Sequence, residues 1–234
     1  MITQAQKLKI FQSQVTNLRK LNQVRSHLFR SANLSLRSND ESALETTTRC
    51  LSLVFCSWVE CSFSKLIHTP YGFELDEIEQ IKRSDGRSRS VSDSWNTAVT
   101  LGLRKVEIGP GLRQNQRQAI ERLVDTHVVE PSIIRNKIAH GQWEIALNRS
   151  NTDVNPELSN AISNIDIIKV ERWFESHKHL SLLLEALIES PNRAYHRDFW
   201  VHVTNLEAYL KSTSSWNLAE RKRRLQLKRL KRPN

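Results

Sequence analysis

Arginine, asparagine and histidine occur together in one short segment, Arg135-Asn136-Lys137-Ile138-Ala139-His140-Gly141. A histidine, with an ordinary pKa of about 6.5, can accept or donate a proton near neutrality, and a guanidinium can stabilise charge that develops on a phosphate. On a helix, Asn136 and His140 would share one face because they are four residues apart. Arg135 would lie about 140° around the helix from His140, within reach of its long side chain. These residue types at this spacing suit proton transfer beside a bound anion such as a phosphate.

The interval between arginine and histidine is by itself a weak signal in this chain. Four of the eight histidines follow an arginine by five residues, in the pairs Arg122/His127, Arg135/His140, Arg172/His177 and Arg197/His202. Only the second and the fourth pair have a polar amide or carboxylate directly after the arginine, namely Asn136 and Asp198. The segment with Arg197, Asp198 and His202 is therefore a rival site, and the residue pattern leaves it open.

Three features around the first segment favour it over the rival. Ile133, Ile134 and Ile138 predict a buried stripe that would hold the segment on a packed helix. Pro131 fits the first turn of such a helix. Gly141 ends the segment without a side chain, which would leave room for an RNA backbone beside the imidazole.

The order of an arginine, a polar residue and a histidine four to six positions after the arginine resembles the ribonuclease motif of the HEPN family. Arg135, Asn136 and His140 match that motif, and Gly141 follows as a glycine often does in the family. The likeness covers this motif and the helical character of the chain. It implies a helical bundle that acts as an endoribonuclease without metal or cofactor, in which the 2′-hydroxyl of RNA attacks the neighbouring phosphate.

The same resemblance implies the partners and the setting of the protein. HEPN sites usually form where two domains meet, and one motif per chain offers one histidine for two proton-transfer roles. We therefore expect a homodimer with a composite active site. The expected setting is a toxin or an effector of anti-phage defence, the expected substrate is transfer RNA or messenger RNA, and an antitoxin or a sensor protein is a further expected partner. If the 197–202 segment is also used, one chain carries two motifs.

The hydrophobic pattern predicts an all-α fold, here an HEPN-like helical bundle with additional helices. Apolar residues recur at helical spacing, and the chain has only six glycines and six prolines. Glu60 lies inside the most apolar expected helix, either as an exposed carboxylate or as a buried partner that orients an arginine or a histidine. The expected helices span about 4–30, 41–68, 75–81, 93–106, 114–129, 131 onward, 163–189, 193–212 and 217–231, with polar connections at 83–90 and 148–157.

Positive charge is concentrated at the C-terminal end. The chain has a net charge of +10, and residues 216–234 hold eight lysines and arginines against Glu220 alone. We therefore divide the chain into a helical domain, 1–215, and a basic tail, 216–234. Such a tail suits RNA, although a solvated tail and an acidic protein partner remain open. The expected RNA-binding residues are Lys137, Arg221, Lys222, Arg223, Arg224, Lys228 and Arg229.

Other patterns narrow the functional classes. The sequence has no run of about 18 apolar residues, so no membrane span is expected. Cys50, Cys56 and Cys61 have no CxxC spacing and lie among apolar residues, as reduced core cysteines of a cytoplasmic protein do. No glycine-rich phosphate loop and no HExxH pattern occurs, so no metal ligand is assigned. The alternative function is a non-catalytic HEPN-like subunit of a defence complex that binds nucleic acid or protein.

Overall fold

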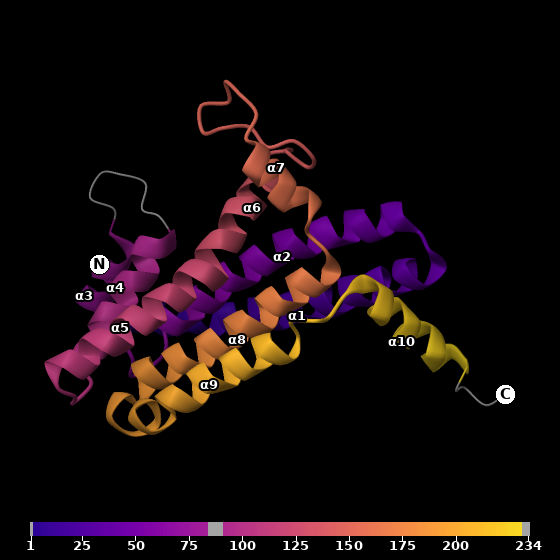
Figure 1. The fold of residues 1–234 in the computed structure, drawn as a ribbon. Helices are drawn as coiled ribbons and strands as arrows, with labels where there is room; N and C mark the ends of the chain where they lie inside the picture. The colour runs from indigo at the N-terminus through magenta and orange to yellow at the C-terminus, as the bar shows by residue number, and fades with distance from the viewer. Residues whose placement is uncertain (1, 84–90, 231–234) are drawn as a thin grey trace.

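The structure is a computed structural model that describes residues 2–83 and 91–230, with the backbone alone at 228–230. Over these ranges the chain is all-α, as expected, with ten α-helices, two π-helical turns and no strand (Figure 1). The elements are α1 (Gln4–Ser38), α2 (Glu41–Ile67), α3 (Leu75–Lys82), α4 (Val91–Arg104), α5 (Pro110–Val124), η1 (Asp125–Val129), α6 (Glu130–Ala139), α7 (Pro156–Ser163), α8 (Ile167–Glu189), η2 (Pro191–Tyr195), α9 (His196–Ser212) and α10 (Leu218–Leu230).

Helices α1 and α2 form a long hairpin with a tight turn. Asn39 ends α1 with φ 62°, a left-handed conformation that asparagine tolerates better than most residues. Asp40 then caps α2, where its side chain accepts a hydrogen bond of 3.0 Å from the amide of Ala43. The sequence predicted that the first helix ends near residue 30. It continues to Ser38 because Ala32 and Leu36 are buried against the bundle.

Helix α2 is the central helix of the bundle. It packs against α1, α6 and α8, and its residues Leu51, Phe55 and Leu66 are almost completely buried. Phe55 meets Phe174 of α8 edge to face, with ring centroids 5.1 Å apart. In the part of the chain that the structure describes, α2 is also the one helix long and apolar enough to cross a membrane. Its packing against three helices explains that apolar composition as that of a core helix.

The run from α5 to α6 is continuous, whereas the sequence predicted two separate helices with a break before Pro131. The amide of Glu130 donates to the carbonyl of Asp125, five residues earlier, which makes η1 a π-helical turn. A proline inside a regular α-helix leaves one carbonyl without a donor and presses its ring on the preceding turn. A π-helical turn directly before Pro131 accommodates this conflict without ending the helix.

The C-terminal half contains one helix that the sequence pattern missed. Helix α7 lies between the polar connection expected at 148–157 and the helix expected at 163–189, where no helix was predicted. Asn155 caps it by accepting a hydrogen bond of 2.9 Å from the amide of Leu158, and Pro156 occupies its first turn.

Helices α8 and α9 then pair, and α10 projects from the bundle toward the C-terminus (Figure 1). Of the polar connection expected at 83–90, residues 84–90 lie outside the described ranges.

Candidate active site

Arg135 leaves α6 on the side that packs against α2. Its guanidinium forms an ion pair with Glu60 and lies against the thiol of Cys56. The Arg135 side chain is 24% exposed and that of Glu60 is 59% exposed, so the pair lies at the surface. Burial by itself lowers the pKa of Arg135, but Cys56 and Glu60 together raise it above its usual value. Glu60 is thus exposed, as one interpretation of the sequence had it, and it pairs with an arginine, as the other had it.

The uncharged thiol of Cys56 packs against this arginine. Burial raises the pKa of its thiol to about 11, although Arg135 acts in the opposite direction. A thiol with that pKa stays protonated near neutrality, so Cys56 lacks the thiolate that nucleophilic chemistry needs. The sequence pattern identified Cys56 only as a core residue. Its contact with Arg135 joins two helices that are distant in the chain and leaves no local signal.

Asn136 and His140 lie on the outer face of α6, and both are exposed. Their four-residue spacing places them on one face, as predicted. Ile134 and Ile138 are buried, but Ile133 is 44% exposed, so the predicted stripe of three isoleucines is wrong at Ile133. The reason is helical periodicity: Ile133 precedes Asn136 by three residues and shares its outward face, whereas the buried pair is four apart on the inner face.

The three motif residues do not form a closed cluster within one chain. Arg135 points to α2, and Asn136 and His140 face away from the bundle. Among the contacts of residues 2–83 and 91–230, no hydrogen bond or ion pair joins Arg135 to Asn136 or His140. The helix therefore presents a cation at its edge and an imidazole with an amide on its open face.

Gly141 ends α6 in a Schellman motif. Its φ is +79°, its amide donates to the carbonyl of Ile138 (3.1 Å), and the amide of Gln142 donates to that of Lys137 (2.9 Å). A Cβ added at Gly141 would meet no atom within 4 Å, so the backbone conformation and not crowding selects glycine. The sequence predicts close approach by RNA backbone at this glycine, whereas the structure gives it a role in ending the helix.

Replacing Gly141 with alanine is expected to lower the free energy of unfolding by about 1 kcal/mol, because an L-residue is strained at this φ. Urea unfolding at neutral pH measures the change. Gly111 is the matched control: it lies in the first turn of α5, and an added Cβ there also has open space. Gly111→Ala is expected to leave stability unchanged or slightly higher. Equal losses for both variants would contradict this explanation.

Lys137 holds the loop that follows the motif. Its Nζ donates to the carbonyl of Leu147 (2.5 Å), and the side chain of Gln142 accepts from the amide of Leu147 (2.8 Å). Leu147 in turn forms an isolated antiparallel bridge with Val154. The expected role of Lys137 in RNA binding stays a prediction. In this structure its ammonium is half-buried and already bonded, and it fixes the 141–155 loop beside His140.

The rival segment lies on a different pair of helices. Arg197 and Asp198 bind each other through two hydrogen bonds of 2.7 Å at the start of α9. This pairing lowers the pKa of the Asp198 carboxyl and occupies the guanidinium with its own neighbour. His202 is half-buried. Helix α9 packs along α8, whereas α6 packs along α2, so the two segments are not brought together.

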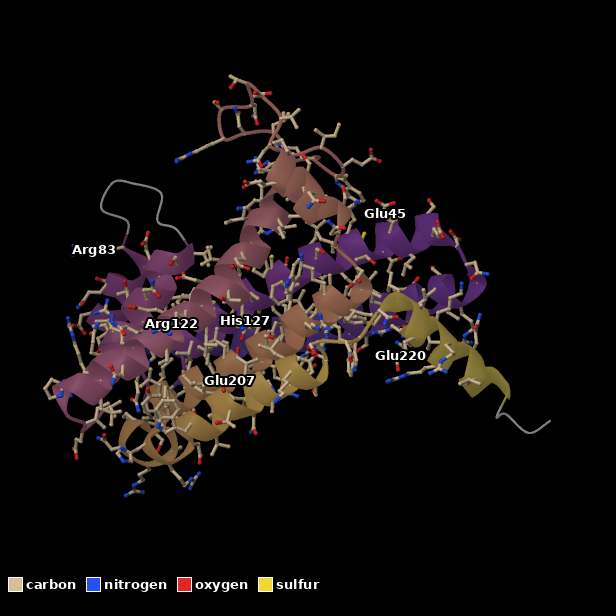
Figure 2. All side chains as sticks on the ribbon, in the orientation of Figure 1. Glu45, Arg83, Arg122, His127, Glu207 and Glu220 are labelled. Carbon is tan, nitrogen blue, oxygen red and sulfur yellow. The ribbon has the colours of Figure 1, made fainter. Side chains whose placement is uncertain are left out.

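The basic tail forms helix α10, which is partly bound to the bundle. Arg221 donates to the Asn33 side chain (3.0 Å) and pairs with Glu171, which anchors α10 to α1 and α8. Arg224 pairs with Glu220, a residue labelled in Figure 2. Lys222 lines a hollow at the α1–α2 turn, and Arg223 is exposed. The side chains of Lys228 and Arg229 lie outside the described part.

Two hollows border the Arg135–Glu60 pair, one on each side of Glu60. The first, of about 240 Å³, lies between α2, α4 and α6 and is lined by Cys56, Val59, Glu60, Phe63, Val91, Ser94, Trp95 and Ser132. The second, of about 450 Å³, lies between α1 and α2 and is lined by Gln14, Asn17, Lys20, Leu21, Ser57, Glu60 and Cys61. The sequence pattern predicted neither, because each depends on how separate helices meet.

No group of three or more histidine, cysteine, aspartate or glutamate side chains with metal-binding geometry occurs among the described residues. Comparison with models of protein families, with curated proteins and with solved structures finds no match for this chain. The geometry around α6 is therefore the basis for a functional proposal.

Proposed function

We propose that this protein is a metal-independent endoribonuclease whose site is built from Arg135, Asn136 and His140. One observation carries the proposal: α6 presents a permanently charged arginine, fixed by Glu60, next to an open face that bears an imidazole and an amide. That set provides phosphate binding and proton transfer, the two requirements of a reaction in which RNA supplies its own nucleophile.

In the proposed reaction the 2′-hydroxyl oxygen of RNA attacks the adjacent phosphorus. One histidine accepts the hydroxyl proton, and a second donates a proton to the departing 5′-oxygen as the phosphorus–oxygen bond breaks. The products are a 2′,3′-cyclic phosphate and a free 5′-hydroxyl. Arg135 binds the phosphate oxygens, where negative charge grows in the transition state. Asn136 holds the imidazole or the phosphate by hydrogen bonds.

Two histidines require two copies of the motif, so we propose a homodimer in which the outer faces of α6 meet. The open face supports this arrangement, because it carries the exposed apolar side chain of Ile133 beside Asn136 and His140. We further propose a cytoplasmic protein with transfer RNA or messenger RNA as its substrate. A role in a toxin or anti-phage system, with an antitoxin or sensor as partner, belongs to this proposal.

The test is cleavage of total RNA by the purified full chain in EDTA. We expect fragments with 2′,3′-cyclic phosphate ends and, by mass measurement in solution, a dimer. Strict dependence on Mg²⁺, or fragments with 5′-phosphate ends, would contradict the mechanism. Intact RNA at a protein concentration where the dimer forms would contradict the function itself.

Arg135→Lys is expected to lower the cleavage rate about a hundredfold at saturating RNA, although the charge is kept. A lysine offers a point charge without the planar fork that contacts Glu60 and a phosphate together. Single-turnover cleavage in EDTA measures the effect. Arg117→Lys is the matched control, because Arg117 also pairs with a glutamate, Glu121, but lies on α5. A rate for Arg135→Lys equal to that of the control would remove Arg135 from the proposed site.

The second candidate is a non-catalytic nucleic-acid-binding subunit, and the projecting basic helix α10 favours it. Binding dominated by phosphate contacts weakens steeply with salt. This candidate predicts that deleting 217–234 abolishes RNA binding while Arg135→Ala and His140→Ala leave it unchanged. Arg221 and Arg224 have acidic partners, as Arg135 has, but α10 carries no histidine that could transfer a proton, and we therefore rank this candidate second.

A further inference from the structure

We propose that the hollow between α2, α4 and α6 holds one unstacked nucleobase of a single-stranded RNA, adjacent to the phosphate that Arg135 binds. The inference rests on the proposed ribonuclease function and adds a determinant of which nucleotide is cleaved. Proteins that read single-stranded RNA commonly take a splayed base into such a pocket and read its edge by hydrogen bonds.

The walls of this hollow suit a flat aromatic ring. Phe63 and Trp95 stack on each other with centroids 4.5 Å apart and an interplanar angle of 24°. Trp95 is 1% exposed, so it backs Phe63 from inside the core, and half-buried Phe63 provides the aromatic surface that faces the hollow. Val91 also lines the hollow and is 37% exposed, which places it on the open side. A base that entered past Val91 would meet apolar and aromatic surface, which favours stacking over solvation.

The polar groups of the hollow can read the edge of a base. Glu60 binds Arg135 through Oε1, which leaves Oε2 as an acceptor. An ionised carboxylate only accepts hydrogen bonds, so it favours the amino groups of adenine, cytosine and guanine over uracil, whose one ring donor, N3–H, lies between two carbonyl oxygens that repel the carboxylate. Ser94 and Ser132 line the same space, and the Ser132 hydroxyl, which donates to the carbonyl of Val128 (2.6 Å), can accept a further hydrogen bond. The structure thus indicates a preference set by Glu60.

The position of the hollow links base binding to the reacting phosphate. Glu60 is both a wall of the hollow and the partner of Arg135. Ser132 precedes Arg135 by three residues on α6, about 4.5 Å along the helix axis. On the other side of Glu60, the α1–α2 hollow is lined by the amides of Gln14 and Asn17 and by Lys20, groups that suit a sugar–phosphate backbone. An RNA strand across the Arg135–Glu60 pair would therefore place a base on one side and its backbone on the other.

The experiment uses the full chain, a pool of unstructured RNA of random sequence and EDTA, and sequencing of the cleaved ends. Wild-type protein is expected to show a preference for amino-bearing bases at one position next to the cut. Val91→Trp fills the hollow and is expected to reduce that preference about tenfold. Leu182→Trp is the matched control, since Leu182 is 43% exposed on α8, and it should keep the preference.

A second variant keeps the test decisive if Val91→Trp unfolds. Glu60→Gln changes a largely exposed side chain and adds a hydrogen-bond donor, so it is expected to admit uracil at the same position, whatever its effect on rate. Cleavage by wild type with no base preference, or with a preference that both variants retain, overturns the base pocket and leaves the ribonuclease proposal standing. No cleavage by wild type overturns both.

Discussion

Replacement of His140 with alanine is expected to lower the rate of RNA cleavage in EDTA by about 10⁴-fold, because in a homodimer the change removes both the proposed base and the proposed acid. His140 is exposed at the end of α6, so the variant should unfold at the same urea concentration as wild type. His196→Ala is the matched control for an exposed histidine on another helix. His202→Ala tests the rival segment: a loss for His202→Ala with full activity for His140→Ala would move the site to α9.

Mixing the subunits tests the composite nature of the site. If two copies of His140 act on one phosphate, a dimer of one wild-type and one His140→Ala chain is inactive. A ninefold excess of the variant would then lower the activity per wild-type chain by about tenfold, because most wild-type chains would be in mixed dimers. If each chain holds a complete site, the excess variant would leave that activity unchanged. The same excess of His196→Ala should have no effect, since its dimers remain active.

The helices were predictable because their signal is local. Apolar side chains at helical spacing identified α1, α2, α8 and α9 from the chain alone, and only their ends were displaced. The π-helical turn η1 was not predictable from periodicity, because it resolves a conflict between Pro131 and a helix that tertiary packing continues on both sides. Helix α7 was missed since it begins inside a polar run, and its first residues, Pro156 and Glu157, were assigned to the connection at 148–157.

The candidate site was likewise predictable where the signal is local and not where it depends on contacts between helices. The spacing of Asn136 and His140 fixes their shared face, and the sequence predicted this correctly. Periodicity does not say how far a neighbouring helix covers a face, and for that reason the prediction for Ile133 was wrong. The pairing of Arg135 with Glu60 was one of two open interpretations, and the contact with Cys56 joins residues 79 positions apart and left no trace in the pattern.

The free energy of unfolding is expected to decrease strongly when the pH falls. His177 is completely buried on α8 among Phe55, Trp58 and Trp95, with ring centroids 5.1 to 6.2 Å away. Neither ring nitrogen has a hydrogen-bond partner among the described residues. Burial lowers the pKa of His177 to about 3, helped by the nearby His127.

His127 lies in η1, between α5 and α6, as Figure 2 shows, and burial lowers its pKa to about 4. Both imidazoles are therefore neutral in the folded protein at pH 5, whereas in the unfolded chain, with pKa values of about 6.5, both are mostly protonated. The unfolded state then binds more protons, so stability falls as the pH drops below about 6.5 and the loss levels off near the folded pKa values. At pH 5 the two histidines together lower the free energy of unfolding by about 4 kcal/mol relative to pH 7. That is a large part of the 5–15 kcal/mol typical of a folded protein.

Urea unfolding of wild type and His177→Leu at pH 7 and pH 5 measures this linkage. The leucine variant is expected to lose about half of the pH dependence, because only His127 of the pair still titrates. At pH 7 it should be at least as stable as wild type, since it removes buried ring nitrogens that have no partner. His196→Leu, at an exposed position, should keep the full pH dependence. Equal pH dependence in wild type and His177→Leu would show that His177 is protonated to the same extent in the folded and unfolded states, and would contradict a neutral His177 in the folded protein.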